Sequence, residues 1–428
     1  MKSSVEIGLL GAGVVGGGTY EVLTRKSDQI TEQVGVPVRV RRVLVRDLEK
    51  IRETIIPAEL LTTRAEDILE DPEIDVVVEV MGGEEPARTL MMAAIESGKH
   101  VVTANKEVIA KFGFELMRMA DERGVDLFFE ASVGGGIPII RVLRRDLLAN
   151  DITAIQAIIN GTTNYILTEM ERGQDYLDAL RHAQRLGYAE ADPRNDVQGI
   201  DAAYKLAILA SLAFRAHVRP SDIRHAGIEE LQAKDFRYAQ EMGYVIKLIA
   251  MARLVDDEIE VAVHPMLIPR DHHLASVKGV YNAVLIEGDQ IDQMMLYGRG
   301  AGAKPTASAV LADLGAVARN IVHGNPERLG VPRNGRRVRH FDEMEARFYI
   351  RMQVADKPGV LARISQVLGD EGISIASVIQ KETDETARVA ELVIMTHAAT
   401  ERRVAEAIQL IRTLPITRAV NTFIRVAR

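Results

Sequence analysis

Two lysines and a group of acidic residues are the side chains best suited to chemistry in this sequence. Lys205 is the only charged residue in Ala202–Phe214, and a helix that apolar is expected to be buried. Asp201 lies four residues earlier on the same helix face, so it can pair with the buried amine. Burial lowers the pKa of a lysine and a carboxylate raises it, which suits Lys205 to donate a proton near neutral pH. The alternative is a surface Asp–Lys pair at the exposed start of the helix.

More acidic groups and a second lysine stand near this pair. Glu190 and Asp196 precede the helix and are expected to converge on the same lysine. Lys106 follows the apolar run His100–Ala104, at the carboxyl end of an expected strand, where ligands bind in open α/β sheets. An exposed residue at a helix start is the alternative for Lys106. We prefer the functional interpretation because several acidic residues gather around one lysine.

A G-x-G-x-x-G pattern supplies the expected cofactor site. It directly follows the apolar run Val5–Leu10 and opens a helix, which is the context that makes the pattern specific for a dinucleotide. Its glycines permit a tight turn, close approach of a pyrophosphate and close helix–strand packing, and the helix N-terminus attracts phosphate. The predicted cofactor contacts here are Gly11, Ala12, Gly13, Val14, Val15 and Gly16. A glycine-rich turn without a ligand is the alternative.

The end of the second strand bears on the choice between NADP and NAD. Arg46 suits a 2′-phosphate, whereas Asp47 suits a ribose 2′-hydroxyl. Because Arg46 comes first, with Lys50 and Arg52 close behind, the sequence favours NADP slightly over NAD. Solvated turn charges are the alternative.

The composition excludes several kinds of chemistry. The 428 residues include no cysteine, which removes disulfides, thiolate metal ligands and the thiohemiacetal route of aldehyde oxidation. No tyrosine is followed by lysine four residues later, so the Tyr-x-x-x-Lys arrangement of short-chain dehydrogenases is absent. Lysine, histidine and carboxylates remain to assist hydride transfer to a nicotinamide.

Charge and hydropathy restrict the partners. A net charge of −8 argues against a nucleic-acid-binding surface. No run approaches the roughly 20 apolar residues of a membrane span. We expect a soluble, cytoplasmic protein with neither nucleic-acid nor membrane partners, and the length suits two or three domains.

Residues 1–130 alternate apolar strands with helices, which indicates a doubly wound, Rossmann-like α/β domain. The expected strands are Val5–Leu10, Val38–Val45, Asp75–Val80, His100–Ala104 and Asp126–Phe129, and the expected helices are Pro86–Ser97 and Lys111–Arg123. A later helix, Pro305–Val322, is expected to pack back here, so that residues 303–325 complete this domain.

In residues 131–302 the regular alternation of short strands and helices ends, and the pattern indicates an α+β substrate domain. The expected helices are Gly136–Ala149, Asp175–Arg185 and Val197–Phe214, and the expected strands are Ile152–Ile159, Val261–His264 and Ala283–Ile286. Residues 326–346 are expected to form a linker, because Asn325–Gly335 is rich in Pro, Gly, Asn and Arg.

Residues 347–428 form a third unit. Phe348, Ile350, Met352 and Val354 alternate with Tyr349, Arg351 and Gln353, which is strand periodicity. The further elements expected are helices Val360–Leu368 and Thr400–Arg412 and strands Ile373–Gln380, Val389–Thr396 and Ala419–Val426. This βαββαβ order is typical of the ferredoxin-like split βαβ fold.

Residues 5–325 resemble homoserine dehydrogenases. The most specific block comprises Asn160-Gly161-Thr162-Thr163-Asn164-Tyr165-Ile166-Leu167, Leu186-Gly187-Tyr188-Ala189-Glu190-Ala191-Asp192-Pro193, and Asp196 to Lys205. The order of the glycine turn, Ala104-Asn105-Lys106, Glu130–Pro138 and Gly300-Ala301-Gly302 also fits. The resemblance implies NAD(P)-dependent hydride transfer between L-homoserine and L-aspartate 4-semialdehyde, in threonine, methionine and isoleucine biosynthesis.

The resemblance also implies roles for the lysine–acid cluster. Lys205 would give a proton to the aldehyde oxygen, and Lys106 would lie near the same oxygen and the cofactor. Glu190 would hold the substrate amino group, with Asp196 in the same substrate site. Asp201 would help to position the substrate or Lys205.

Further contacts follow from the same resemblance. Thr103 and Gly302 would touch the cofactor, and residues 131–302 would also serve dimerisation, in a homodimer or homotetramer. A monovalent cation, Na⁺ or K⁺, would be held largely by backbone oxygens of a turn formed by Glu130, Val133, Gly135 and Ile137. A glycine-rich turn without a cation is the alternative.

The third unit resembles ACT domains at Asp356-Lys357-Pro358-Gly359-Val360-Leu361-Ala362. ACT domains bind amino acids at paired interfaces, and free N–H groups at a helix start would suit an amino-acid carboxylate. The predicted effector contacts are Asp356, Gly359 and Val360, and threonine is the effector expected from pathway logic. An ACT unit that serves only oligomerisation is the alternative.

Two competing functions fit less well. Another ACT-linked dehydrogenase, such as one for phosphoglycerate, would place a substrate domain before the Rossmann core, whereas the glycine pattern here begins at Gly11. A catalytically inactive amino-acid sensor would predict loss of the lysine–acid cluster. Yet Lys106, Glu190, Asp201 and Lys205 are all present.

Overall fold

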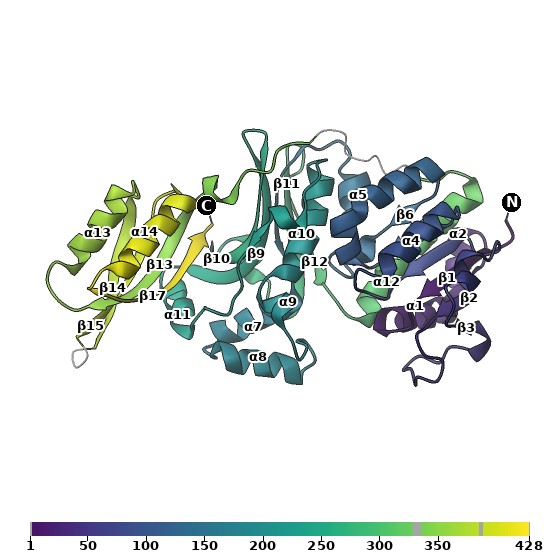
Figure 1. The fold of residues 1–428 in the computed structure, drawn as a ribbon, viewed down its shortest axis with the longest axis horizontal. Helices are drawn as coiled ribbons and strands as arrows, with labels where there is room; N and C mark the ends of the chain where they lie inside the picture. The colour runs from purple at the N-terminus through teal and green to yellow at the C-terminus, as the bar shows by residue number, and fades with distance from the viewer. Residues whose placement is uncertain (1, 328–334, 385–387, 428) are drawn as a thin grey trace.

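The computed structural model describes residues 2–327, 335–384 and 388–427. Three units lie in a row along the long axis of the molecule, with the N-terminal unit at one end and the third unit at the other (Figure 1). The predicted fold class is confirmed, because a Rossmann-type sheet, an α+β unit and a ferredoxin-like unit follow one another along the chain.

The N-terminal unit is built on a parallel sheet. Its strands are β1 (Val5–Leu10), β2 (Val38–Leu44), β3 (Leu61–Thr62), β4 (Val76–Glu79), β5 (His100–Thr103) and β6 (Leu127–Phe128). They pair in parallel in the order β3-β2-β1-β4-β5-β6. The chain reverses its direction of travel across the sheet between β1 and β4, which opens a crevice at the carboxyl edge where ligands of such sheets bind.

Helices cover both faces of this sheet. The helices are α1 (Val14–Arg25), α2 (Ser27–Val34) and α12 (Ala303–His323) on one face, and α4 (Ala87–Glu96) and α5 (Lys106–Arg123) on the other, with a short α3 (Glu66–Leu69). Leu9 packs towards α1 and α12 and Leu10 towards α4 and α5, as strand alternation requires. Helix α5 begins before the predicted Lys111, because the Asn105 side chain accepts the Val108 N–H at 3.2 Å and caps it.

The central unit is a mainly antiparallel sheet with helices packed against it (Figure 1). Its strands are β7 (Ile152–Ile158), β8 (Arg224–His225), β9 (Tyr244–Val255), β10 (Glu258–Pro269), β11 (Tyr281–Gly288) and β12 (Asp292–Arg299). Its helices are α7 (Gly161–Glu171), α8 (Tyr176–Arg185), α9 (Arg194–Val197), α10 (Ile200–Ala213) and α11 (Ala233–Glu241). Helix α10 contacts both β9 and α5, so it lies where the central and N-terminal units meet.

The predicted helix Gly136–Ala149 is wrong in extent. Gly134 and Gly135 have positive φ angles in a turn, and the Gly136 N–H donates to the Arg299 carbonyl at 3.2 Å. Helical backbone is confined to α6 (Ile139–Arg141) and the π-helical turn η3 (Val142–Asp146). Strand β9 was not predicted, because its apolar run is buried on both faces and lacks the alternation of polar and apolar residues that marks a strand.

The third unit has the predicted βαββαβ order. Its elements are β13 (Glu345–Ala355), α13 (Val360–Asp370), β14 (Ile375–Asp384), β15 (Val389–Thr396), β16 (Ala399–Thr400), α14 (Glu401–Thr413) and β17 (Thr417–Val426). Tyr349 and Arg351 alternate with the apolar residues of β13, as the strand periodicity predicted. Both side chains are fully buried, because α11 of the central unit covers that face and Asp235 on it binds both.

The expected linker, residues 326–346, includes 328–334, which lie outside the described residues. Its later part is bound to the central sheet. The Ile259 N–H donates to the Arg337 carbonyl at 2.9 Å, and the Arg339 N–H donates to the Ile259 carbonyl at 2.8 Å. Strand β13 begins at Glu345, two residues before the predicted start of the third unit.

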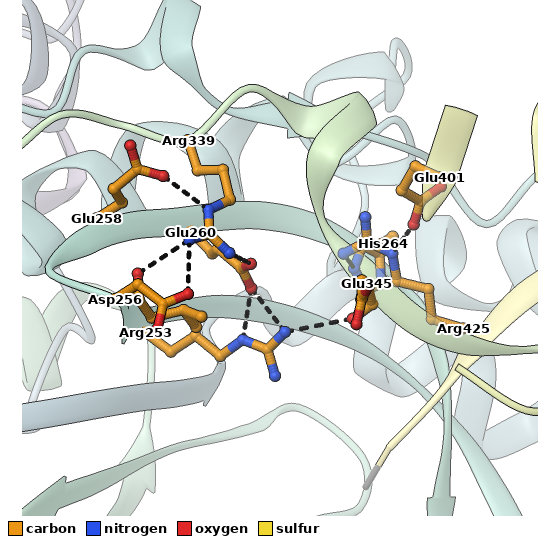
Figure 2. Close-up of polar contacts among 10 residues, drawn as sticks. Arg253, Asp256, Glu258, Glu260, His264, Arg339, Glu345, Glu401 and Arg425 are labelled. Carbon is orange, nitrogen blue, oxygen red and sulfur yellow. Dashed lines mark hydrogen bonds and ion pairs between the residues drawn. The ribbon is translucent and has the colours of Figure 1, made fainter. Parts of the chain in front are cut away.

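The central and third units share one sheet, which the sequence does not predict. Strand β17 pairs in parallel with β10 at Met266–Arg425 and Leu267–Val426. The strand order is therefore β12-β11-β7-β9-β10-β17-β13-β15-β14. Beside this pairing, Arg425 binds Glu401 and lies 2.6 Å from Nε2 of His264 (Figure 2). Burial, together with Arg425, holds the pKa of His264 well below its usual value, so a neutral ring accepts this hydrogen bond.

A second group of ion pairs holds the linker against β9 and β10 (Figure 2). Arg339 contacts Glu258 at 2.8 Å, Glu260 at 3.1 Å and Asp256 at 3.2 Å. Arg253 pairs with Glu260 at 2.6 Å and also donates to the Glu345 carbonyl at 3.3 Å. The segment that leads into the third unit is thus fixed by side chains as well as by backbone.

None of the helices in the described parts of the chain combines the length and apolar character needed to cross a membrane.

A buried lysine in the central sheet leads to a stability prediction. Lys247 on β9 is 1% exposed and donates to the Val277 carbonyl at 2.7 Å, and burial lowers its pKa to about 8. Below pH 8 the folded protein must hold a buried ammonium, which costs up to about 3 kcal/mol. We expect Lys247→Met to raise the free energy of unfolding at pH 7 by about 1–2 kcal/mol, less than the full cost because a hydrogen bond is lost.

The sign of the pH dependence provides the check. Between the folded pKa and the unfolded value near 10.5, the unfolded chain binds more protons, so wild-type stability should rise with pH there. Urea unfolding at pH 7 and pH 10 should show the advantage of Lys247→Met shrinking at the higher pH. A difference between the two proteins that does not vary with pH would contradict this explanation.

Candidate active site

The site is centred on one buried carboxylate that binds two lysines. Asp201, on the first turn of α10, is 5% exposed. Its Oδ1 lies 2.7 Å from Nζ of Lys106, and its Oδ2 lies 2.6 Å from Nζ of Lys205. Lys106 is the first residue of α5, so the packing of α10 against α5 brings the two lysines together.

Lys205 lies one helical turn after Asp201, with its side chain 12% exposed. Its Nζ also donates to the carbonyl of Ile159, just beyond the end of β7, at 2.9 Å. An ammonium group has three N–H donors. The described residues provide two acceptors for it, which leaves one N–H for a substrate oxygen.

The electrostatics follow from this shared carboxylate. Burial alone would raise the pKa of Asp201, but Lys205 and Lys106 outweigh it and hold the pKa well below its usual value. The charge of Asp201 in turn raises the pKa of Lys106. Burial raises the pKa of the neighbouring Asp196. Asp201 is therefore ionised, and Lys106 carries a proton, at neutral pH.

A cavity of about 250 Å³ opens beside these groups. It is lined by Gly82, Gly83, Ala104, Asn105, Lys106, Glu107, Glu190, Asp192, Asn195, Asp196, Ile200, Asp201 and Tyr204. The predicted residues Lys106, Glu190, Asp196 and Asp201 thus face one space, and Lys205 adjoins it through its contact with Asp201. A mixture of cationic and anionic groups in one cavity suits a small zwitterionic molecule.

The glycine turn lies at the same edge of the sheet as this cavity. Gly11 follows β1 with a φ of +104°, and a Cβ there would come within 3.2 Å of the Val80 carbonyl and 3.0 Å of Met81. Val80 and Met81 lead directly into Gly82 and Gly83 of the cavity wall. A dinucleotide on the turn can therefore extend its reactive end towards the lysines.

The turn has the spacing that a pyrophosphate requires. A Cβ at Gly16 would lie 2.1 Å from the Gly11 carbonyl oxygen, so only glycine fits there. A Cβ at Gly13, the N-cap of α1, would meet no atom within 4 Å, so the space above it is open for a ligand. Gly302, with a φ of +117°, caps α12, whose first residue Ala303 lies against α1 at Gly18. These residues fit a bound dinucleotide.

Two alanine substitutions should separate folding from cofactor binding. We expect Gly13→Ala to change the free energy of unfolding by less than about 1 kcal/mol, because its Cβ enters open space, but to weaken cofactor binding about tenfold or more. Gly16→Ala should cost about 1–3 kcal/mol of stability, because its Cβ overlaps the Gly11 carbonyl. Thermal unfolding and fluorescence titration with reduced cofactor measure the two effects. Unchanged cofactor affinity in Gly13→Ala would place the phosphates elsewhere.

The remaining predicted cofactor residues differ in their surroundings. Val14 is 66% exposed, and Arg46, just after β2, is exposed as well. Arg52 donates to the carbonyls of Asp47 and Lys50, so it is engaged within its own loop. Two further predicted contacts, Ala12 in the turn and Val15 in the first turn of α1, are partly buried.

Thr103 is the last residue of β5. It is fully buried, and its hydroxyl donates to Glu79 Oε2 at 2.6 Å and accepts the Asn105 N–H at 2.9 Å. Its side chain therefore organises the loop after β5, and the contact with a cofactor that we predicted for Thr103 stays a prediction. Ala104 and Asn105 line the cavity instead.

The turn expected to hold a cation is buried and compact. The two carboxylate oxygens of Glu130 accept the N–H groups of Ile140 at 2.7 Å and Arg141 at 2.8 Å. Gly135 has a φ of +55°, and a Cβ there would come within 2.5 Å of the Gly300 carbonyl. Val133 and Ile137 are buried beside it. Backbone oxygens are hard ligands that suit Na⁺ or K⁺.

The expected effector residues lie at a turn of the third unit. Gly359 caps α13 with a φ of +87°, and Asp356 and Gly359 are exposed, whereas Val360 is buried in the core of this unit. The Asp356 N–H donates to the Arg388 carbonyl at 2.8 Å. The turn is therefore fixed at one end and open to a ligand at the other.

Sequence reasoning missed three residues that organise the site. Asn160 binds both Asp196 and Asp201 through its side chain. Glu79, 0% exposed, accepts the Met81 N–H at 2.8 Å and thereby orders the loop after β4. Asn105 caps α5 and donates to the Gly83 carbonyl at 2.7 Å. All three stand at carboxyl ends of strands, a position that could have drawn attention to them.

The fold and the site together define an NAD(P)-dependent oxidoreductase. Family models agree: residues 11–130 match the homoserine dehydrogenase NAD binding domain, residues 138–314 match homoserine dehydrogenase, and residues 348–415 match the ACT domain. The matches cover each of the three units that the structure contains.

Full-length relatives give the same result. The chain is 40% identical to homoserine dehydrogenase of Bacillus subtilis, covering 99% of this chain and 98% of that one, and 43% identical to the Pseudomonas aeruginosa enzyme, covering 96% of each. A crystal structure of a homoserine dehydrogenase from Thiobacillus denitrificans is 43% identical, with a TM-score of 0.92 over 99% of this chain and 98% of that one. The chain belongs to the homoserine dehydrogenase family.

One further solved structure matches only part of the chain. It is a hyperthermophilic archaeal homoserine dehydrogenase in complex with NADPH, 29% identical, with a TM-score of 0.63, covering 76% of this chain and 99% of that one.

Proposed function

We propose that the cavity beside Asp201 is where this enzyme interconverts L-aspartate 4-semialdehyde and L-homoserine. The observation that carries this proposal is the shared carboxylate, which binds the amines of Lys106 and Lys205 at the edge of a cavity that adjoins the glycine turn. A nicotinamide bound there supplies a hydride to the aldehyde carbon, or accepts one from the alcohol.

In the direction of aldehyde reduction, Lys205 gives its free N–H proton to the oxygen that becomes the hydroxyl of homoserine. Lys106 lines the cavity and donates a hydrogen bond to the same oxygen as charge develops on it. Asp201 orients both amines and, through its charge, raises the pKa of Lys106. In the reverse direction Lys205 takes the proton back.

The acidic groups across the cavity recognise the substrate ammonium. Glu190 is exposed at the cavity mouth, and Asp196 is partly buried deeper in it. A carboxylate that faces a substrate ammonium gains a charge-assisted hydrogen bond. We assign the ammonium group to Glu190, with Asp196 beside it.

We propose NADP as the preferred cofactor. Arg46 is exposed at the end of β2, where the adenosine ribose of a dinucleotide on this turn would lie, and a guanidinium suits a 2′-phosphate. The archaeal relative in complex with NADPH adds support. The engagement of Arg52 within its own loop makes Arg46 the residue on which the preference depends.

We also propose a bound cation, an amino-acid effector and an oligomeric state for this enzyme. A monovalent cation on the backbone oxygens of Glu130, Val133, Gly135 and Ile137 would brace the turn beneath the cofactor, and KCl or NaCl, compared with choline chloride, should then raise the melting temperature. Threonine is the proposed effector, at the turn around Gly359. We further propose that the chain forms a homodimer or homotetramer. We propose a cytoplasmic location for it.

The function is tested by following oxidation of NADPH and NADH by the full-length protein with L-aspartate 4-semialdehyde. We expect turnover with both cofactors and a higher kcat/KM with NADPH. Succinic semialdehyde, which lacks the amino group, is the matched control and should react with a much higher KM. Absence of turnover with either cofactor would refute the assignment, and equal KM values for the two aldehydes would remove Glu190 and Asp196 from it.

A further inference from the structure

A buried amide connects the two acidic residues of the cavity. Asn160 is 5% exposed and follows β7, in extended conformation, as the N-cap of α7. Its Nδ2 donates to Asp196 Oδ1 at 2.7 Å and to Asp201 Oδ2 at 2.9 Å. Both N–H donors of the amide are therefore used on carboxylates.

The other end of the amide fixes its orientation. Asn160 Oδ1 accepts the Thr163 N–H at 2.9 Å and the Thr163 hydroxyl at 3.0 Å, as an N-cap does. If the amide were reversed, its oxygen would face two carboxylates and its NH₂ would face a backbone N–H. Only one orientation satisfies all four hydrogen bonds, so the start of α7 aims the amide donors into the site.

This orientation determines how Asp201 presents its two oxygens. Oδ2 accepts from Asn160 and Lys205, which leaves Oδ1 for Lys106. The carbonyl of Ile159, the residue before Asn160, accepts a second hydrogen bond from Lys205 at 2.9 Å. Residues at the end of β7 thus hold both Lys205 and the carboxylate that pairs with it.

The amide also brings together two carboxylates that would otherwise repel each other. Asp201 is buried and Asp196 is partly buried, and the charge of Asp201 adds to burial in raising the pKa of Asp196. Two N–H donors between them offset part of this repulsion. Without Asn160, nothing else among the described hydrogen bonds connects Asp196 to Asp201.

We propose that Asn160 is a positioning residue, whose amide holds Asp201 so that Lys106 and Lys205 meet at the substrate oxygen, and holds Asp196 towards the substrate ammonium. This inference rests on the proposed function. A helix cap without influence on the reaction is the competing explanation, and the two differ in which end of the amide matters.

Two substitutions keep the cap and remove the donors. Asn160→Ser and Asn160→Asp both supply a good N-cap oxygen for Thr163, but neither places an NH₂ between the carboxylates. We expect kcat to fall about 30- to 100-fold in both, because misplaced catalytic groups cost about this much, and the KM for aspartate semialdehyde to rise. NADPH binding should stay close to wild type, and the melting temperature should fall less in Asn160→Ser than in Asn160→Asp, which adds a carboxylate beside Asp196 and Asp201.

The pH profile distinguishes positioning from general loss of structure. The added carboxylate in Asn160→Asp should favour protonated lysines, so the alkaline limb of kcat should move to higher pH in this variant and not in Asn160→Ser. Thr163→Val, which weakens only the cap end, is the matched control and should lower the melting temperature with kcat nearly unchanged.

The outcomes separate this inference from the proposed function. If Lys205→Ala is inactive while Asn160→Ser and Asn160→Asp keep wild-type kcat, KM and pH profile, Asn160 is only a cap and the inference is overturned. If the activity of the Asn160 variants merely follows their melting temperature, as in Thr163→Val, it is overturned as well. A Lys205→Ala variant with wild-type kcat would instead overturn the proposed function.

Discussion

Replacing Lys205 with alanine is expected to lower kcat by about 10²- to 10⁴-fold, the range in which a positioned proton donor contributes. The side chain is 12% exposed, and it binds Asp201 and the Ile159 carbonyl on the side away from its free N–H. Without it, the oxygen formed by hydride transfer must take its proton from water or from Lys106. The loss should appear in single-turnover measurements of the chemical step as well as in steady-state kcat.

Cofactor affinity is the control for this variant. The glycine turn is built by β1 and α1, apart from α10, so NADPH should bind Lys205→Ala with nearly wild-type affinity. Lys106→Ala provides the comparison: it should raise the KM for the aldehyde and lower kcat less. A parallel loss of NADPH binding and turnover in Lys205→Ala would indicate a structural lysine, and a larger loss of kcat in Lys106→Ala would exchange the two roles.

Replacing Arg351 with methionine is expected to lower the free energy of unfolding by about 3–5 kcal/mol, because a buried charge is left uncompensated. Arg351 and Asp235 are both fully buried and lie 2.6 Å apart, across the contact between β13 and α11. Arg351 also donates to Gln232 at 2.9 Å and Thr422 at 3.2 Å. Chemical denaturation followed by circular dichroism measures the loss.

A second substitution tests the explanation. In Arg351→Met combined with Asp235→Asn, no unpaired charge remains at position 235, and the amide can still accept from Thr422, so part of the lost stability should return. Arg181→Met, which removes an exposed partner of Asp178, should cost less than about 1 kcal/mol. If the double variant is as unstable as the sum of the single variants, the loss stems from packing and not from the unpaired carboxylate.

Local patterns predicted much of the fold and the elements of the site. The glycine turn, the apolar strands around it and the Asp201–Lys205 pair are each contained in a short stretch of sequence, and each depends on backbone geometry that such a stretch determines. Lys106 could be placed at the carboxyl edge of the sheet for the same reason. The family resemblance then connected these parts to a single reaction.

What the sequence did not reveal depends on contacts between distant elements. That Lys106 and Lys205 share one carboxylate follows from the packing of α5 on α10, for which no local signal exists. The alternation around Arg351 predicted a strand but not what covers it, and its burial depends on contact with the distant helix α11. Asn160 was visible within a motif, but its role requires knowing where Asp196 and Asp201 lie.

The pairing of β17 with β10 has a consequence for any shortened form of this chain. Strand β10 would lose its pairing at Met266 and Leu267 if the chain stopped before β13, and unpaired backbone groups on an apolar strand invite association with other chains. The third unit thus also protects this part of the central unit from association with other chains. If the third unit were removed to obtain an effector-insensitive enzyme, charged or proline substitutions would be needed on the edge of β10 that becomes exposed.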